Sequence, residues 1–174
     1  NSNAMNTVFG AGEWTLDYFE TCDPALVFSA NTNFVFLEGS DFCADELENF
    51  LITNLPIIEN WVESGGRLLL NAAPNEGDGM SFGFGDVYLS YWGGASNVVA
   101  TDPGHPIFNT PYTPTGTSWT GSSFSHASVS GTGLTPLIVD VSIPSTVAYS
   151  EGRYGSDGIV GFGGMTTTNW HTPY

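Results

Sequence analysis

The sequence predicts an α/β fold built around a mostly parallel sheet, and three observations within residues 34–74 support this prediction. An apolar run from Phe34 to Leu37 has the length of a buried strand. A long amphipathic pattern from about Ala44 to Glu63 follows it and stops at Gly65-Gly66, where a helix would end. A second apolar run, Leu68 to Leu70, comes next. Strand, helix and strand in this order form the unit of a parallel sheet.

The predicted long helix carries its apolar side chains on one stripe and its first carboxylates at the beginning. Asp45 and Glu46 fall in the first turn, where negative charge favours the positive end of the helix dipole. Pro56 lies inside the pattern, so we expect it to kink the helix or to split it near Thr53-Asn54. The apolar stripe consists of Leu47, Leu51, Leu55, Ile58 and Val62.

Shorter elements are expected on both sides of this unit. Before it, the spacing predicts a helix over 3–9, a strand at Trp14–Tyr18 and a helical turn from Asp23-Pro24 to Phe28. After it, glycine-rich turns separate short apolar runs, which predict an added antiparallel β region. The predicted strands are Phe82–Phe84, Val87–Trp92, Asn97–Ala100, Phe124–Val129, Leu134–Val139, Thr146–Ser150 and Gly158–Gly163.

Composition restricts the classes of partner. The 174 residues include 18 acidic and two basic residues, which gives a formal net charge of −16. Such a chain repels nucleic acid, so no nucleic-acid partner is expected. We expect no membrane insertion either, because no run of about 18 apolar residues occurs. The length predicts one domain with a sizeable core.

Six segments in order resemble the class I glutamine amidotransferase-like (flavodoxin-like) modules of large secreted bacterial proteins of the adhesin type. The resemblance implies one flavodoxin-like domain over residues 1–174, located extracellularly or at the cell surface. Such a domain would open with a further strand and close with a further helix, so we expect a chain trimmed at both ends, a fragment of a longer one. The matching segments are Met5–Trp14, Phe34–Asp41, Gly65–Gly77, Asp102–Asn109, Ser118–Ala127 and Gly161–Pro173.

The same resemblance argues against amidotransferase activity. The family places its catalytic cysteine in the elbow after the strand that here ends at Leu70, and this chain has Asn71-Ala72-Ala73 there. His171 has a comparable place to the family's histidine but lacks the following glutamate. Without a thiolate, acyl transfer has no nucleophile. We therefore expect a non-catalytic structural or adhesion module, such as a subunit of a surface fibre or layer, whose partners are other domains or copies.

One alternative is a hydrolase at the carboxyl ends of the strands, where parallel sheets gather their ligands. Asp41 and Glu76 would supply carboxylates, and His171 would act as acid, base or metal ligand. Asn71 would line the same pocket as a ligand-binding residue. The structural alternative is that Asp41 caps the long helix and that Asn71 and His171 bond only their own loops.

A second alternative is a module that binds Ca²⁺ or a glycan. Glu76 and Asp78, helped by Asp86, form an acidic and tight segment that suits Ca²⁺, although it lacks the spacing of an EF-hand loop. Ca²⁺ is the only cofactor that the sequence suggests. Four aromatic residues lie near Gly/Pro/Thr loops, where aromatic rings stack on sugars: Trp92, Tyr112, Trp119 and Trp170. The structural alternative is that they cap the core.

The chain has two cysteines, Cys22 and Cys43, which flank the Phe34 strand. A disulfide between them would tie the loop before that strand to the start of the long helix. In an oxidising compartment, loop closure by this bond would contribute about 3 kcal/mol. Two separate thiols are the alternative.

Overall fold

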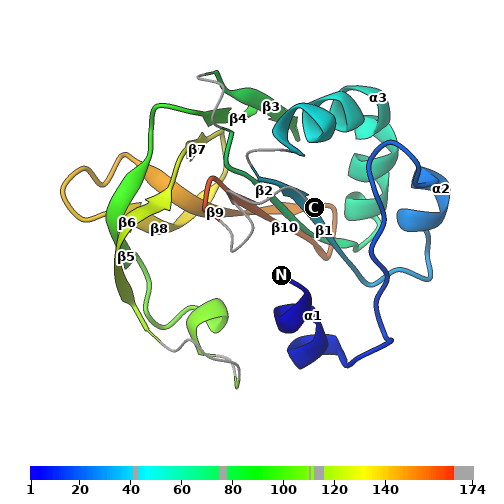
Figure 1. Cartoon of the computed structure of the whole chain (residues 1–174), viewed down its shortest axis with the longest axis horizontal. Coiled ribbons are helices and arrows are strands. Elements are labelled where there is room, and N and C mark those ends of the chain that lie inside the picture. Colours follow the sequence, from blue (N-terminus) through cyan, green and yellow to red (C-terminus); the bar gives the residue numbers. More distant parts are fainter. Residues whose placement is uncertain (41–42, 75–77, 110, 112–115, 167–174) are drawn as a thin grey trace.

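A computed structural model of the chain shows a mostly β protein, with 37% strand and 23% helix (Figure 1). The structure describes residues 1–40, 43–74, 78–109, 111 and 116–166. Within these residues, ten strands form a curled mixed sheet of seven strands and an antiparallel sheet of three. The expected flavodoxin-like, mostly parallel α/β sheet is therefore wrong.

Only three neighbouring strands of the large sheet are parallel: β1 (Phe34–Gly39), β2 (Arg67–Ala72) and β10 (Gly158–Gly163). A parallel pair needs a long crossover, and the helix between β1 and β2 supplies one. After β2, several short turns join consecutive strands that pair antiparallel, and others lead from one sheet to the other. The antiparallel part continues from β10 through β9 (Val147–Tyr154), β8 (Thr135–Asp140), β5 (Ala95–Ala100) and β6 (Ser118–Ser125).

The predicted strand–helix–strand unit is confirmed. The crossover helix α3 spans Ala44–Glu63, and it is one continuous helix despite Pro56, so the expected split does not occur. Pro56 is exposed. The missing hydrogen bond to the preceding turn therefore lies on the side that water can reach. The opposite side of α3 packs on the sheet and buries Ala44, Leu47, Phe50, Leu51, Ile58, Trp61 and Val62.

The small sheet consists of β3 (Met80–Gly83), β4 (Val87–Ser90) and β7 (Ser128–Ser130), and lies with α3 over one face of the large sheet (Figure 1). The strands predicted at Phe82–Phe84 and Val87–Trp92 appear with shifted bounds as β3 and β4, which pair antiparallel. Phe162 of β10 joins the two layers, because its ring lies 6.1 Å from the Phe82 ring and 5.4 Å from the Phe84 ring. The apolar side chains of the small sheet that face this core are Met80, Phe82, Val87, Leu89 and Val129.

Two sequence-based predictions of strands were wrong. Residues 14–18 form no strand, and Leu16 and Tyr18 are 62% and 58% exposed, because the alternating pattern there has no neighbouring strand to pair with. The predicted strand 124–129 is divided between β6 and β7. The backbone N–H groups of His126 and Ala127 both donate to the Gly164 carbonyl, and this takes the chain out of the ladder.

Three short helical segments complete the fold: α1 (Ser2–Phe9), α2 (Pro24–Val27) and the 3₁₀ turn η2 (Pro106–Phe108). As predicted, Asp23 caps α2, since its carboxylate accepts from the Ala25 N–H at 2.9 Å. Within the described residues, no helix is both long and apolar enough to cross a membrane.

The face of β1, β2 and β10 opposite α3 lies on the side of α1, and we call it the α1 face (Figure 1). Its apolar side chains are half-buried, whereas the alternate positions toward α3 are buried. The Phe9 ring of α1 stacks on Phe34 at 5.4 Å, but α1 itself has no buried residue. The half-buried apolar residues of the α1 face are Phe34, Phe36, Leu69 and Ile159.

Candidate functional site

The parallel strands end together, as a ligand site at their carboxyl edge would require. Gly39 of β1 pairs with Ala72 of β2, and Asn71 of β2 pairs with Gly163 of β10. The sequence placed Asn71 at this edge as a candidate ligand-binding residue. The structure confirms its position at the strand end.

Asn71 is 1% exposed, and both ends of its side-chain amide are used inside the protein. Its Nδ2 donates to the Met165 carbonyl at 2.9 Å, and its Oδ1 accepts from the Met165 N–H at 3.0 Å. A side-chain amide thus pairs with the backbone just after β10 as a neighbouring strand would. This Asn71–Met165 clamp holds the end of β10 against β2.

Ser40, which follows β1, is also buried, and its hydroxyl lies 3.3 Å from the Glu38 carboxylate, to which it donates. Ala73 donates its N–H to the Gly39 carbonyl at 2.8 Å and so ties the two strand ends together. The hydrolase candidates Asp41, Glu76 and His171, and the glycan candidate Trp170, lie outside the described residues. The hydrolase hypothesis therefore gains no geometry from the structure.

The carboxylates suggested for Ca²⁺ have different neighbours. Asp78 is exposed and raises the pKa of Glu48 on α3, after the larger effect of burial. Asp86 accepts from the N–H and the hydroxyl of Thr132, at 2.8 and 2.7 Å, and these bonds hold the pKa of Asp86 below its usual value. The described residues include no group of three or more His, Cys, Asp or Glu side chains suited to a metal. Glu76, the third carboxylate suggested for Ca²⁺, lies outside the described residues.

Trp119 lies on β6 and not in an open loop, between the aromatic rings of Phe124 on β6 and Phe108 on η2. Its ring lies 5.9 Å from both Phe108 and Phe124. The three rings pack against the smaller of two hydrophobic clusters, which includes Val98 and Tyr149. Trp119 is half-buried, so its contacts agree with the structural alternative, in which the ring caps the core.

Cys22 and Cys43 are both free and half-buried in the structure. Burial, then Glu38, Glu46 and Glu20, raises the pKa of Cys43 to about 11. The pKa of Cys22 is raised as well, by burial and then by Asp17. The predicted disulfide stays a prediction.

Native Cys43 is expected to alkylate about 100-fold more slowly than Cys43 of the unfolded chain at pH 8, because only the thiolate reacts and the pKa rises from 9.0 to about 11. For the same reason, the stability that the neutral thiol contributes is full below about pH 9 and is lost as the pH rises toward 11. Iodoacetamide labelling with peptide mass spectrometry measures both rates. Equal rates would contradict the half-buried, acidic surroundings of Cys43, and failure to label before reduction would indicate the disulfide.

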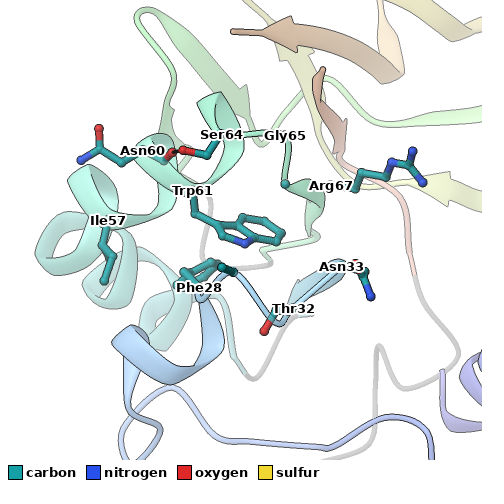
Figure 2. A pocket seen from close by; sticks show the side chains of 11 residues that line it. Phe28, Thr32, Asn33, Ile57, Asn60, Trp61, Ser64, Gly65 and Arg67 are labelled. Atoms are coloured by element: carbon teal, nitrogen blue, oxygen red, sulfur yellow. Dashed lines mark hydrogen bonds between the residues drawn. The ribbon is translucent and has the colours of Figure 1, made fainter. Parts of the chain in front are cut away.

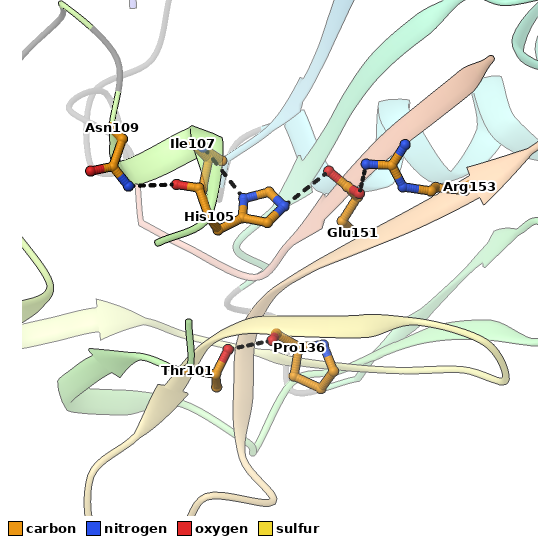
Figure 3. Close-up of polar contacts among 7 residues, drawn as sticks. All are labelled: Thr101, His105, Ile107, Asn109, Pro136, Glu151 and Arg153. Atoms are coloured by element: carbon orange, nitrogen blue, oxygen red, sulfur yellow. Dashed lines mark hydrogen bonds and ion pairs between the residues drawn. The ribbon is translucent and has the colours of Figure 1, made fainter. Parts of the chain in front are cut away.

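A second polar cluster, which the sequence did not suggest, surrounds Glu151 on β9 (Figure 3). One Glu151 oxygen lies 2.8 Å from the Arg153 guanidinium, and the other lies 3.7 Å from Nε2 of His105. Nδ1 of His105 accepts from the Ile107 N–H at 3.3 Å, so the neutral ring carries its proton on Nε2, toward Glu151. The cluster therefore fastens the η2 loop to the sheet, as a structural contact. The sequence predicted a strand at Thr146–Ser150, which stops one residue before Glu151, and it gave no indication of this contact.

A hollow of about 660 Å³ lies at the opposite edge of the sheet, between the end of α3 and the starts of β1 and β2 (Figure 2). The Trp61 ring points into its middle above Phe28, and its Nε1 donates to the Ser29 carbonyl at 3.1 Å. The side chains of Asn60 and Arg67 point away from this ring. Because the polar groups diverge, we assign no ligand to the hollow.

No protein family, curated protein or solved structure matches this chain.

Proposed function

We propose that this chain is a non-catalytic structural or adhesion module of an extracellular protein, which associates with other copies or domains as in a surface fibre or layer. The observation that carries the proposal is the Asn71–Met165 clamp. At the elbow where acyl transfer needs a free nucleophile, the side chain is buried and both of its polar ends are bonded to backbone. These bonds suit a structural role for Asn71, which holds two strands together, better than a catalytic role.

The α1 face supports association. Three parallel strands present Phe34, Phe36, Leu69 and Ile159 there as half-buried apolar side chains. The partly exposed α1 covers them incompletely, since its Val8 and Phe9 are 41% and 40% exposed. Contiguous apolar surface of this kind favours contact with another protein surface.

Charge supports a copy of the same chain as the partner. The two basic residues of the chain, Arg67 and Arg153, both lie on the α1 face, because each pairs with Ile159 of β10 from opposite sides. The other charged side chains of the chain are acidic. Arg153 already pairs with Glu151 of the same chain at 2.8 Å, so a second copy would bring a carboxylate to Arg67 while its apolar residues cover Ile159.

Purified protein is expected to self-associate, and to do so more strongly at about 0.15 M salt than at about 0.01 M, because salt screens the repulsion between chains of charge −16. Sedimentation velocity over a range of protein concentrations measures this. Ile159→Lys should abolish association by placing a third cation among apolar contacts. Ile52→Lys is the matched control, since Ile52 is 75% exposed on α3 and the net charge changes equally.

If both variants lost association to the same extent, the loss would be due to the change in net charge and not to the α1 face. A wild-type chain that stays monomeric under all conditions would overturn the proposed self-association. If that monomer also turned over an ester, amide or glycoside substrate, the hydrolase hypothesis would replace the non-catalytic one.

A further inference from the structure

The outer face of the small sheet, which points away from the core, is made of hydroxyl-bearing side chains. Along β4 and β7, and along β3 as far as Phe82, buried inner positions alternate with outer positions that are exposed or half-buried. The pairing of the strands aligns Ser81, Tyr88 and Ser130 in one row, and Ser90 with Ser128 in the next. We call these five residues the serine face.

The serine face carries no charged side chain, although the chain has a net charge of −16. An acidic face would repel anions and attract cations, and a basic one would do the reverse. A face of hydroxyl groups favours neither anions nor cations. It offers hydrogen-bond donors and acceptors to a ligand that is itself uncharged and rich in hydroxyl groups.

Two aromatic side chains are exposed on or beside this face. Tyr88 is 44% exposed within β4, and Trp92 is 84% exposed just after it. The Trp92 ring lies 4.6 Å from the Tyr91 ring in an edge-on arrangement, which restricts its orientation. Trp is seldom so exposed in a folded domain, and exposed aromatic rings are typical of surfaces that bind.

Two glycines allow these aromatic segments to lie close against the face. A Cβ at Gly79 would overlap the Leu89 carbonyl oxygen and would lie 3.0 Å from Cε1 and the hydroxyl oxygen of Tyr88, so the Tyr88 side chain lies close to this position. A Cβ at Gly93 would overlap the Ser128 hydroxyl, so the Tyr91–Trp92 turn packs against β7. Glycine within or beside a strand commonly marks such a close approach.

We propose that the serine face binds a neutral polysaccharide. Sugar rings would stack on Tyr88 and Trp92 through their C–H faces, and their hydroxyl groups would bond to Ser81, Ser90, Ser128 and Ser130. Since this face is on the other sheet from the α1 face, the inference goes beyond the proposed self-association and can fail separately from it (Figure 1).

Affinity gel electrophoresis tests the proposal, with xyloglucan, galactomannan, laminarin and soluble starch as neutral polysaccharides and polygalacturonate as the anionic one. At least one neutral polysaccharide should retard the wild-type chain, and polygalacturonate should not. Trp92→Ala and Tyr88→Ala should each weaken that binding about tenfold or more, as for central aromatic residues of interfaces. Tyr18→Ala is the control, because Tyr18 is 58% exposed away from both sheets, and it should bind as wild type does.

No retardation by any neutral polysaccharide would overturn the proposal. Equal retardation of wild type and both face variants would do so as well, because binding would then lie elsewhere. Sedimentation velocity of Trp92→Ala tests whether a second copy of the chain, and not a polysaccharide, binds to the serine face. If this variant loses self-association and wild type binds no polysaccharide, the serine face is a contact between copies, and the glycan proposal is wrong.

Discussion

Replacing Asn71 by alanine is expected to lower the free energy of unfolding by about 2–4 kcal/mol, because the substitution removes a buried side chain and leaves the N–H and C=O of Met165 without the partner that Asn71 provides. The loss concerns two backbone groups at once, in a place with 1% exposure, where water cannot easily replace the amide. Chemical denaturation followed by tryptophan fluorescence measures the change. The proposed role of Asn71 is entirely structural, so the variant should lose stability and should neither gain nor lose any catalytic turnover.

Asn109 provides a matched control for this variant. Its side-chain amide also makes two hydrogen bonds, to the carbonyls of Pro103 and His105 at 2.9 and 3.0 Å, but the residue is exposed (Figure 3 shows the second bond). Water can satisfy these groups, so Asn109→Ala should cost less than about 1 kcal/mol. Equal and small losses in the two variants would mean that the clamp contributes little, and the main support for a structural elbow would be gone.

Replacing Phe162 by alanine is expected to cost about 3–5 kcal/mol, the range for truncation of a fully buried phenylalanine. Phe162 is 0% exposed, and its ring contacts Phe82 and Phe84 from the small sheet side as well as Tyr154 of β9. The cavity would open at the junction of the two sheets, where α3, β3 and β10 also meet. The experiment thus tests the packing of the layers, and not a local contact only.

Phe9→Ala serves as the comparison for Phe162→Ala. Phe9 is 40% exposed and contacts the sheet through one stacked ring, that of Phe34, so its truncation should cost about 1 kcal/mol or less. Urea denaturation of both variants measures the difference. If Phe162→Ala were no more destabilising than Phe9→Ala, the small sheet would not pack on the large one as described.

Local signals predicted the parallel part of the fold well. The bounds of α3 and β10 agree with the sequence prediction to the residue, because an apolar stripe, glycine caps and short apolar runs all depend on nearby residues. Which strands become neighbours depends on contacts far apart in the chain. Nothing near residue 158 indicates that β10 pairs with β2 on one side and with β9 on the other. The resemblance to a parallel fold filled that gap incorrectly.

The same difference between local patterns and contacts far apart in the chain applies to the candidate sites. The sequence correctly placed Asn71 at the end of a strand, but its partner Met165 is 94 residues away, so the clamp was not foreseeable. The serine face was partly visible as alternation in Val87–Ser90. Recognising it required the register that aligns Ser81, Tyr88 and Ser130 across three strands. The sequence pattern shows which side chains of one strand share a face. Only the pairing of the strands shows which side chains of different strands form a common surface.

Hydrogen–deuterium exchange at low and high protein concentration tests the proposed association most directly, because it locates any contact between copies. The account predicts slower exchange at high concentration in α1 and in the edge strand β1, where α1 has no buried residue and local opening is easy. The strands β3, β4 and β7 should exchange at the same rate throughout. Unchanged exchange in α1 and β1, or slowing confined to β3, β4 and β7, would contradict assembly through the α1 face.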